Sequence, residues 1–389
     1  MCPATTVRLP EKARHGACLS FRILSTYPPT ACGLATFSAA LSDALVANGG
    51  SAGVIRVADG LSPFDPMVVA ELDHGVHASV VSAIEHLSAG DVAIVQHEYG
   101  LYGGTDGDEV LTVMRGLSVP AIAVLHTVLL EPTVHQRQVL EAVVDAAAAV
   151  VVMTESARAR LCDGYDIDES KVATIAHGAD TRSTDAPRAF GARPTVLTWG
   201  LLGAGKGIEW VIDAMAMLKD LRPRPRYLIA GRTHPKVAAL EGDRYRDMLV
   251  RRAWERGVPS SVTFDDTYRD VPSLTKLIQQ AAVVVLPYDS RDQVTSGVLV
   301  DAVAARRPVI ATAFPHATEL LSSGAGIVVP HANPSAIASA LRLVLTEPDV
   351  AGEMAEEAGR LAPGLGWRSV AREYAALAQR VATPIGVTA

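Results

Sequence analysis

Short apolar runs alternate with helical patterns along most of this chain, and this alternation constrains its fold more than any other feature. In the first half, the apolar runs cover residues 21–25, 52–57, 92–96, 121–125 and 149–153. Between them, apolar residues recur at the spacing of an amphipathic helix. Strands that alternate with helices form a parallel sheet with helices packed on it. The pattern therefore predicts a Rossmann-like, doubly wound α/β domain over residues 19–180.

The alternation stops near residue 178 and resumes at residue 195, which indicates a second domain. Because residues 181–194 mix polar residues with glycine and proline, we predict that they form a linker. A second doubly wound domain is predicted over residues 195–365, followed at 366–389 by a segment with one amphipathic helix and no strand. Residues 1–18 are predicted to be a disordered lead-in. Two such domains face each other across a cleft, where a ligand binds.

Composition and cysteine pattern argue against nucleic-acid binding, a metal site built from cysteines and a membrane-spanning helix. A net charge of -7 leaves no extended basic surface for a nucleic acid. The four cysteines, Cys2, Cys18, Cys32 and Cys162, lack metal-ligand spacing, so we expect a reduced, cytoplasmic setting. The longest apolar run, at residues 142–153, is too short to span a bilayer. Peripheral contact with a membrane surface stays open.

A polar loop and a helix follow the apolar run at residues 282–286. Ser296 and Gly297 stand where this helix begins, so backbone N–H groups there lack intrahelical partners. The helix dipole adds partial positive charge at the same end, which suits a phosphate group. Asp301 lies one turn further in, within reach of a sugar hydroxyl. A capped turn that binds nothing is the alternative interpretation.

The segment G-L-L-G-A-G-K-G at residues 200–207 follows one predicted strand and precedes a helix. Its glycines let the backbone approach a ligand closely, and Lys206 offers a positive charge to a phosphate. The spacing nearly matches a P-loop, but Gly207 stands where Ser or Thr would hold magnesium. Phosphate binding, a P-loop-like ATP site and a tight turn without a ligand are therefore the three interpretations.

Polar residues also follow two predicted strands of the first half. His97, Glu98 and Tyr99 come after one run, and His126 comes after the next. Parallel sheets bind ligands at the carboxyl ends of their strands, so we predict that both histidines face the cleft. The sequence D-G-D at residues 106–108 has the spacing by which some sugar transferases hold a metal. Capping of the next helix is the favoured interpretation, and no metal site is predicted.

Together these motifs resemble those of retaining glycosyltransferases of the GT-B fold, in the large family four. The resemblance covers residues 21–381 and rests on three segments: 24–37, 200–207 and 292–312. It implies that the second domain holds the donor, a GDP- or UDP-linked hexose, and that the first holds a sugar, glycolipid or small-alcohol acceptor. The donor-binding residues that it implies are Gly33, Gly203, Lys206, Arg232, Gln293, Thr295, Ser296, Gly297, Val298 and Asp301. The implied acceptor-binding residues are His97, Glu98, Tyr99 and Tyr102.

The resemblance also implies roles and a reaction. Asp301 corresponds to the acid that binds the nucleotide's ribose, and His126 and Lys206 are the implied catalytic residues. Gln293 departs from the pattern because an acid is expected there, and Leu201 stands where many members have arginine. The implied reaction is metal-independent transfer of a hexose, mannose before glucose, with retained configuration and no cofactor. A P-loop-like ATP-binding protein, a sugar phosphorylase and a non-catalytic nucleotide-sugar-binding protein stay open.

Overall fold

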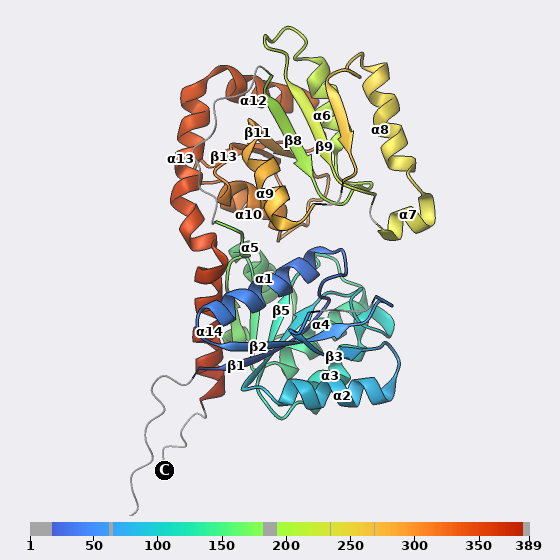
Figure 1. The fold of residues 1–389 in the computed structure, drawn as a ribbon, viewed down its shortest axis with the longest axis vertical. Coiled ribbons are helices and arrows are strands. Elements are labelled where there is room, and N and C mark those ends of the chain that lie inside the picture. The colour runs from blue at the N-terminus through green and yellow to red at the C-terminus, as the bar shows by residue number, and fades with distance from the viewer. Residues whose placement is uncertain (1–17, 62–64, 182–192, 234, 268, 384–389) are drawn as a thin grey trace, which may run out of the picture.

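Figure 1 shows the computed structural model, which describes residues 18–61, 65–181, 193–233, 235–267 and 269–383. Two parallel sheets with helices packed on them lie at opposite ends of the molecule. The predicted fold class, two Rossmann-like doubly wound domains, is confirmed. The predicted lead-in at 1–18 and linker at 181–194 fall almost wholly outside the described residues.

The first sheet has the strand order β3-β2-β1-β4-β5-β6-β7, with parallel pairing throughout. Its middle strands are mostly apolar, and the strands at residues 92–97, 121–125 and 149–152 are buried along their whole length, as is typical of parallel sheets. The strands are β1 (Ser20–Ser25), β2 (Ser51–Val57), β3 (Val68–Leu72), β4 (Val92–His97), β5 (Ala121–Leu125), β6 (Ala149–Val152) and β7 (Val172–Thr174). The helices are α1 (Gly33–Ala47), α2 (His77–Ser88), α3 (Glu109–Gly116), α4 (Val134–Ala146) and α5 (Glu155–Gly164).

The second sheet has the order β10-β9-β8-β11-β12-β13 and is also parallel. Its strands are β8 (Thr195–Trp199), β9 (Arg226–Ala230), β10 (Val262–Asp265), β11 (Val283–Leu286), β12 (Val309–Thr312) and β13 (Gly326–Val329). Its helices are α6 (Ile208–Ala216), α7 (Pro235–Glu241), α8 (Arg244–Glu255), α9 (Val271–Gln279), α10 (Gly297–Ala304), α11 (Pro315–Leu320), α12 (Pro334–Thr346) and α13 (Pro348–Leu365).

The last helix, α14 (Trp367–Ala382), returns to the first domain. Figure 1 shows α13 and α14 in red along one side of the molecule, α13 beside the second domain and α14 beside the first. Apolar residues of α14, Tyr374 among them, share a core with Phe37 of α1 and with the first sheet. The chain passes between the domains twice, after β7 and between α13 and α14. The two passages lie side by side, since Ala179 N donates to Leu365 O at 2.8 Å.

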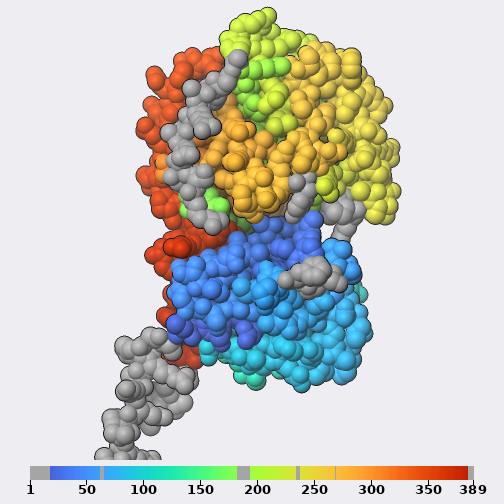
Figure 2. All heavy atoms as spheres, viewed as in Figure 1, coloured from blue at the N-terminus to red at the C-terminus, as the bar shows by residue number. Residues whose placement is uncertain are grey.

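Polar contacts join the two domains directly. Glu319 of α11 accepts hydrogen bonds from the N–H groups of Glu155 and Ser156 at 2.9 and 2.8 Å, so a carboxylate of one domain caps α5 of the other. Thr154 Oγ1 donates to Val294 O at 2.9 Å. Figure 2 shows the same boundary from outside, with blue atoms of the first domain against the second domain. In the portion of the chain described, no helix has the length and apolar character needed to cross a membrane.

Candidate active site

Two pairs of loops meet where the domains face each other. Each sheet reverses its strand order once, between β1 and β4 in the first and between β8 and β11 in the second. Loops that leave adjacent strands at such a reversal diverge and open a crevice for a ligand. Here they are residues 26–32 and 98–108 of the first domain, and 200–207 and 287–296 of the second. Many of the residues predicted from the sequence lie on these loops.

The glycine-rich loop after β8 is held between two neighbouring loops. Leu202 N donates to Arg232 O at 2.7 Å on one side, and Asp289 N donates to Gly205 O at 2.9 Å on the other. Within the loop, Lys206 N donates to Gly203 O at 3.2 Å. Three of its glycines have a positive φ that other residues rarely adopt: Gly200, Gly205 and Gly207. The loop therefore has a fixed shape that depends on glycine.

Lys206 is a half-buried cation in the glycine-rich loop. Its Nζ lies 4.7 Å from the centre of the Tyr288 ring, and burial lowers the pKa of Lys206. Within the described residues no carboxylate pairs with this ammonium group. Tyr288 lies on the loop between β11 and α10, and this loop ends at Ser296. A buried charge without a partner is costly, so the arrangement favours an anionic ligand.

Helix α10 begins at the end of the loop that carries Tyr288. Ser296 caps the helix, since its Oγ accepts from Leu299 N at 3.3 Å, and Ser296 N donates to Nδ1 of His316 at 2.8 Å. A Cβ on Gly297 would lie 2.8 Å from Nε2 of His177, so glycine leaves the room that this imidazole occupies. The first turn of α10 carries the positive end of the helix dipole.

Three other predicted donor residues lie around the start of α10. Thr295 Oγ1 is buried and has no hydrogen-bond partner in the described part of the chain. Gln293 Nε2 donates to Thr295 O at 3.1 Å, so the amide that replaces the expected acid bonds to its own loop. Val298 lies 4.0 Å from the position that a Cβ on Gly200 would take, which brings the two loops of the second domain together.

Asp301 lies one turn into α10 and is a strongly perturbed acid. Burial, with a further contribution from the charge of Asp180, raises the pKa of Asp301 to about 7. The carboxyl group therefore titrates near neutral pH. A protonated carboxyl donates one hydrogen bond, whereas the carboxylate only accepts, so the ionised form suits the hydroxyl groups of a ribose.

The raised pKa of Asp301 predicts how stability depends on pH. The proton bound in the folded state stabilises the fold fully below the unfolded pKa of about 3.9, and this contribution is lost as pH rises through about 7. Because the side chain is only half-buried, we expect a loss on the order of 1–2 kcal/mol. Urea unfolding from pH 4 to pH 8 should show this loss in the wild-type protein and not in Asp301→Asn. Parallel profiles for the two proteins would contradict the assignment.

Helix α1 brings a second helix N-terminus to the crevice. Cys32 caps it through its Sγ, which accepts from Ala35 N at 3.4 Å. A Cβ on Gly33 would meet nothing within 4 Å, so internal packing does not explain glycine there. One turn further on, the ring of Phe37 lies 5.1 Å from that of His177, which in turn adjoins α10. The starts of α1 and α10 thus lie on either side of one imidazole.

The two histidines at the strand ends are neutral, but only one is partly accessible. Burial lowers the pKa of His126 to about 3 and that of His97 to about 4. Nε2 of His126 lies 2.5 Å from Oε1 of Gln96, which fixes the ring. His97 is 1% exposed, and its ring nitrogens lack partners among the described residues. The prediction that both histidines face the cleft therefore needs correction for His97, which lies below the surface.

The predicted acceptor residues on the loop after β4 also differ in burial. Glu98 accepts a hydrogen bond from the hydroxyl of Thr127 at 2.5 Å and one from Tyr99 N at 3.1 Å. Glu98 and Tyr99 are half-buried at the rim. Tyr102 is 5% exposed, and its hydroxyl donates to Gln96 O at 2.6 Å inside the core. Tyr102 therefore supports the loop from within, which corrects its expected contact with an acceptor.

Two further predictions concern Arg232 and the D-G-D segment. Arg232 is exposed on the loop after β9, and its Nε donates to Asp266 O at 3.1 Å. Asp108 precedes α3 without a side-chain cap, so the expected capping role is wrong. Asp106 instead lies 2.9 Å from Nδ1 of His135 and ties this loop to α4. No cluster that could hold a metal ion occurs among the residues described.

Two histidines were missed by sequence reasoning. An open pocket of about 260 Å³ lies between the domains and is lined in part by His177, His316, Glu319 and Val300. From the sequence, no role is assigned to His177 or to His316. His177 follows the last strand of the first sheet, as His97 and His126 follow theirs, and that placement is a signal that could have identified it. No comparable signal marks His316.

Comparisons with known proteins agree with this geometry. Residues 193–347 match the family model described as "Glycosyl transferases group 1". The chain is 28% identical over 257 residues to a D-inositol 3-phosphate glycosyltransferase of Jonesia denitrificans, covering 62% of this chain and 58% of that protein. It is 30% identical over 229 residues to alpha-D-kanosaminyltransferase of Streptomyces kanamyceticus, covering 55% of each. The chain thus spans little more than half the length of these curated relatives.

Solved structures extend the likeness to nearly the whole chain. A glycosyltransferase of Rickettsia africae has a TM-score of 0.76 at 12% identity, over 95% of this chain and 100% of that one. HepE of Anabaena, solved in complex with UDP and glucose, has a TM-score of 0.72 at 16% identity, over 92% and 98%. At such identities the likeness shows the fold alone. The second domain thus matches the group 1 glycosyltransferase family model and nearly the whole chain has the GT-B fold, and together these findings support a group 1 glycosyltransferase of GT-B fold.

Proposed function

We propose that this protein is a retaining glycosyltransferase that moves a hexose from a nucleoside diphosphate sugar to a hydroxyl acceptor. The observation that carries the proposal is Lys206, a half-buried cation for which the described residues supply no carboxylate. Tyr288, whose ring the ammonium group contacts, lies on the loop that leads into α10, and Val298 of α10 lies against the glycine-rich loop that carries Lys206. A diphosphate satisfies both features, since it offers charge to the ammonium group and acceptor oxygens to the backbone N–H groups.

The reaction proposed at this site is a displacement at the anomeric carbon of the donor. The bond from this carbon to the diphosphate oxygen breaks, and a bond to the acceptor oxygen forms on the same face. The proton of the acceptor hydroxyl passes to the departing phosphate oxygen, so no protein base is required. Negative charge builds up on the diphosphate as the bond breaks, and Lys206 with the start of α10 stabilises it without reorganising.

The other site residues have matching roles in this proposal. Asp301, ionised above pH 7, accepts hydrogen bonds from the ribose hydroxyls. His126 stays neutral at physiological pH, so it positions the sugar by hydrogen bonding and carries no charge. The acceptor is assigned to the loop after β4, on which Glu98 and Tyr99 are half-buried. Gly33 leaves space at the start of α1 for the donor.

The substrates are proposed from the resemblance and from the relatives' names. One curated relative is named for D-inositol 3-phosphate, and one structural neighbour was solved with UDP and glucose. We therefore propose a small polyhydroxylated acceptor and a UDP- or GDP-linked hexose. Mannose as the preferred sugar, independence from metal, a cytoplasmic location and peripheral membrane contact stay predictions.

Thermal unfolding with nucleotides tests the proposal. GDP, UDP, ADP and ATP are added in turn, each with magnesium or with a chelator. A nucleotide at about a hundred times its dissociation constant should stabilise the fold by about 2.7 kcal/mol. We expect GDP or UDP to raise Tm with or without metal, and Lys206→Met to lose most of this shift. Stabilisation by ATP with magnesium alone would contradict the proposal and favour the ATP-site interpretation.

A further inference from the structure

Arg56 of β2 is a fully buried arginine whose five N–H groups all have partners. Its side chain is 0% exposed, although arginine rarely leaves solvent without a specific reason. Nε donates to Tyr27 O at 3.3 Å, and Nη1 donates to Leu61 O at 2.9 Å and to Glu71 at 2.6 Å. Nη2 donates to Thr30 Oγ1 at 2.9 Å and to Asp59. The group is complete as it stands and offers no site to a ligand.

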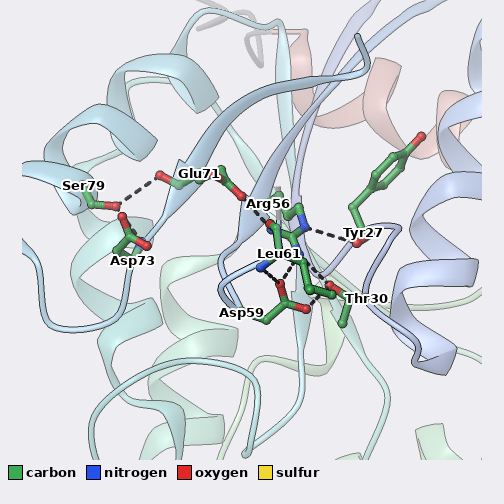
Figure 3. A network of polar contacts seen from close by, with 8 residues as sticks. All are labelled: Tyr27, Thr30, Arg56, Asp59, Leu61, Glu71, Asp73 and Ser79. Atoms are coloured by element: carbon green, nitrogen blue, oxygen red, sulfur yellow. Dashed lines mark hydrogen bonds and ion pairs between the residues drawn. The ribbon is translucent and has the colours of Figure 1, made fainter. Parts of the chain in front are cut away.

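These partners belong to three different segments. Figure 3 shows Tyr27 and Thr30 on the loop between β1 and α1, Asp59 and Leu61 on the loop after β2, and Glu71 on β3. Thr30 also donates to Asp59 at 2.6 Å, so the two loops are linked directly as well. Arg56 thus fastens the loop at residues 27–30 to the edge of the first sheet.

The fastened loop leads straight into the candidate active site. Cys32, which caps α1, and Gly33, whose missing Cβ faces open space, follow Thr30 by two and three positions. Phe37 then places α1 against His177, and His177 adjoins the start of α10 at Gly297. A change in the path of residues 27–30 would therefore move the N-terminus of α1 relative to that of α10.

We propose that Arg56 is a positioning residue that holds the loop at residues 27–33, and with it the N-terminus of α1, in the orientation required to bind the nucleoside diphosphate sugar. The inference rests on the proposed function and deepens it, because it assigns part of donor affinity to a residue that does not touch the donor. A loop that is ordered before binding costs no ordering entropy when the donor arrives.

Arginine is required here rather than any cation. Lysine carries the charge but has three donors on one nitrogen, whereas the five donors of Arg56 reach partners on three segments. In Arg56→Lys at least two of these contacts are lost, while the charge next to Asp59 and Glu71 is kept. The variant therefore separates the geometry of the network from its charge.

The experiment compares three variants of the full chain. Arg56→Lys loosens the network, and Thr30→Val removes only the hydroxyl that links the loop to Arg56 and Asp59. The matched control is Arg22→Lys on neighbouring β1, because Arg22 pairs in register with Gly53, three residues before Arg56. Two quantities are measured: amide hydrogen exchange in the segment 27–33, at Tyr27 and residues 30–33 because Pro28 and Pro29 carry no amide hydrogen, and the steady-state kinetics of sugar transfer.

We expect exchange in residues 27–33 to become about tenfold faster in Arg56→Lys and in Thr30→Val, and to be unchanged in Arg22→Lys. We expect KM for the donor to rise about tenfold with little change in kcat, because an ordering cost is paid on binding and affects ground and transition states equally. Loss of folded protein alone would lower the apparent kcat and leave KM unchanged. Thr30→Val keeps the test valid if Arg56→Lys folds poorly.

Two results would overturn the inference. One is unchanged amide exchange of the loop in both Arg56→Lys and Thr30→Val, and the other is faster exchange without a change in KM for the donor. A wild-type protein that transfers sugar from no nucleoside diphosphate sugar would instead overturn the proposed function. The exchange measurement needs no activity, so the two failures are distinguishable.

Discussion

Replacing Lys206 with methionine is expected to lower kcat for sugar transfer by about 10²–10³-fold, the usual cost of removing one preorganised group that stabilises charge in the transition state. The lysine is the group best placed for this role, since among the described residues the Tyr288 ring is the close partner of Nζ and no carboxylate pairs with it. The free protein should not be weakened to a similar extent. Methionine removes the cost of burying an unpaired ammonium group, and that gain offsets the lost contact with the ring, worth ~0.5–2 kcal/mol.

The measurements are kcat and KM for the donor, with Tm of the free protein recorded for each variant. Lys219→Met is the matched control, because Lys219 is an exposed lysine of the same domain and its Nζ donates to Arg256 O at 2.8 Å. Lys206→Arg should keep part of the rate because it retains the charge. Wild-type kcat in Lys206→Met, or a fall in kcat that follows a loss of folded protein, would remove Lys206 from the mechanism.

The local sequence pattern predicts most strands and helices of the fold. The elements that it does not predict depend on tertiary packing. Strand β3 (Val68–Leu72) lies at the sheet edge with alternating exposure, so it lacks the continuous apolar run of a central strand. Helix α13 (Pro348–Leu365) contains Gly352, Gly359, Gly364 and Pro363, which locally argue against a helix. It forms because Ala358 and Ala362 pack into the core beneath α10.

The residues of the candidate site also fall into two groups, those that local sequence predicts and those that depend on tertiary contacts. Residues that follow a strand or begin a helix, such as Lys206 and Ser296, could be found because their place depends on local sequence. The contacts of His316 with Ser296 and of Glu319 with Ser156 join positions 20 and 163 residues apart, and no spacing indicates them. Burial also cannot be read from a residue's place after a strand or in a motif, which is why the sequence predicts that His97 faces the cleft and that Tyr102 contacts the acceptor, although both are buried.

Gly207→Ala is expected to destabilise the protein by about 3–5 kcal/mol, the range of the largest single-residue effects. Gly207 has φ of +64°, a conformation that costs other residues about 1–2 kcal/mol. Its Cβ would also lie 1.8 Å from Pro287 O, so the loop after β8 and the loop after β11 would have to separate. Both loops form the candidate site, and activity should fall with stability.

Gly205→Ala is the matched control for this prediction. Gly205 has φ of +83°, but its Cβ would meet nothing within 4 Å, so only the conformational cost of about 1–2 kcal/mol applies. Urea unfolding of both variants measures the difference, and equal losses would show that the contact with Pro287 is relieved at no cost. The larger loss in Gly207→Ala would also give a physical reason for the departure from the P-loop pattern. A serine or threonine at 207 would meet the carbonyl of Pro287 through its Cβ, so this loop leaves no room for the side chain with which a P-loop holds magnesium.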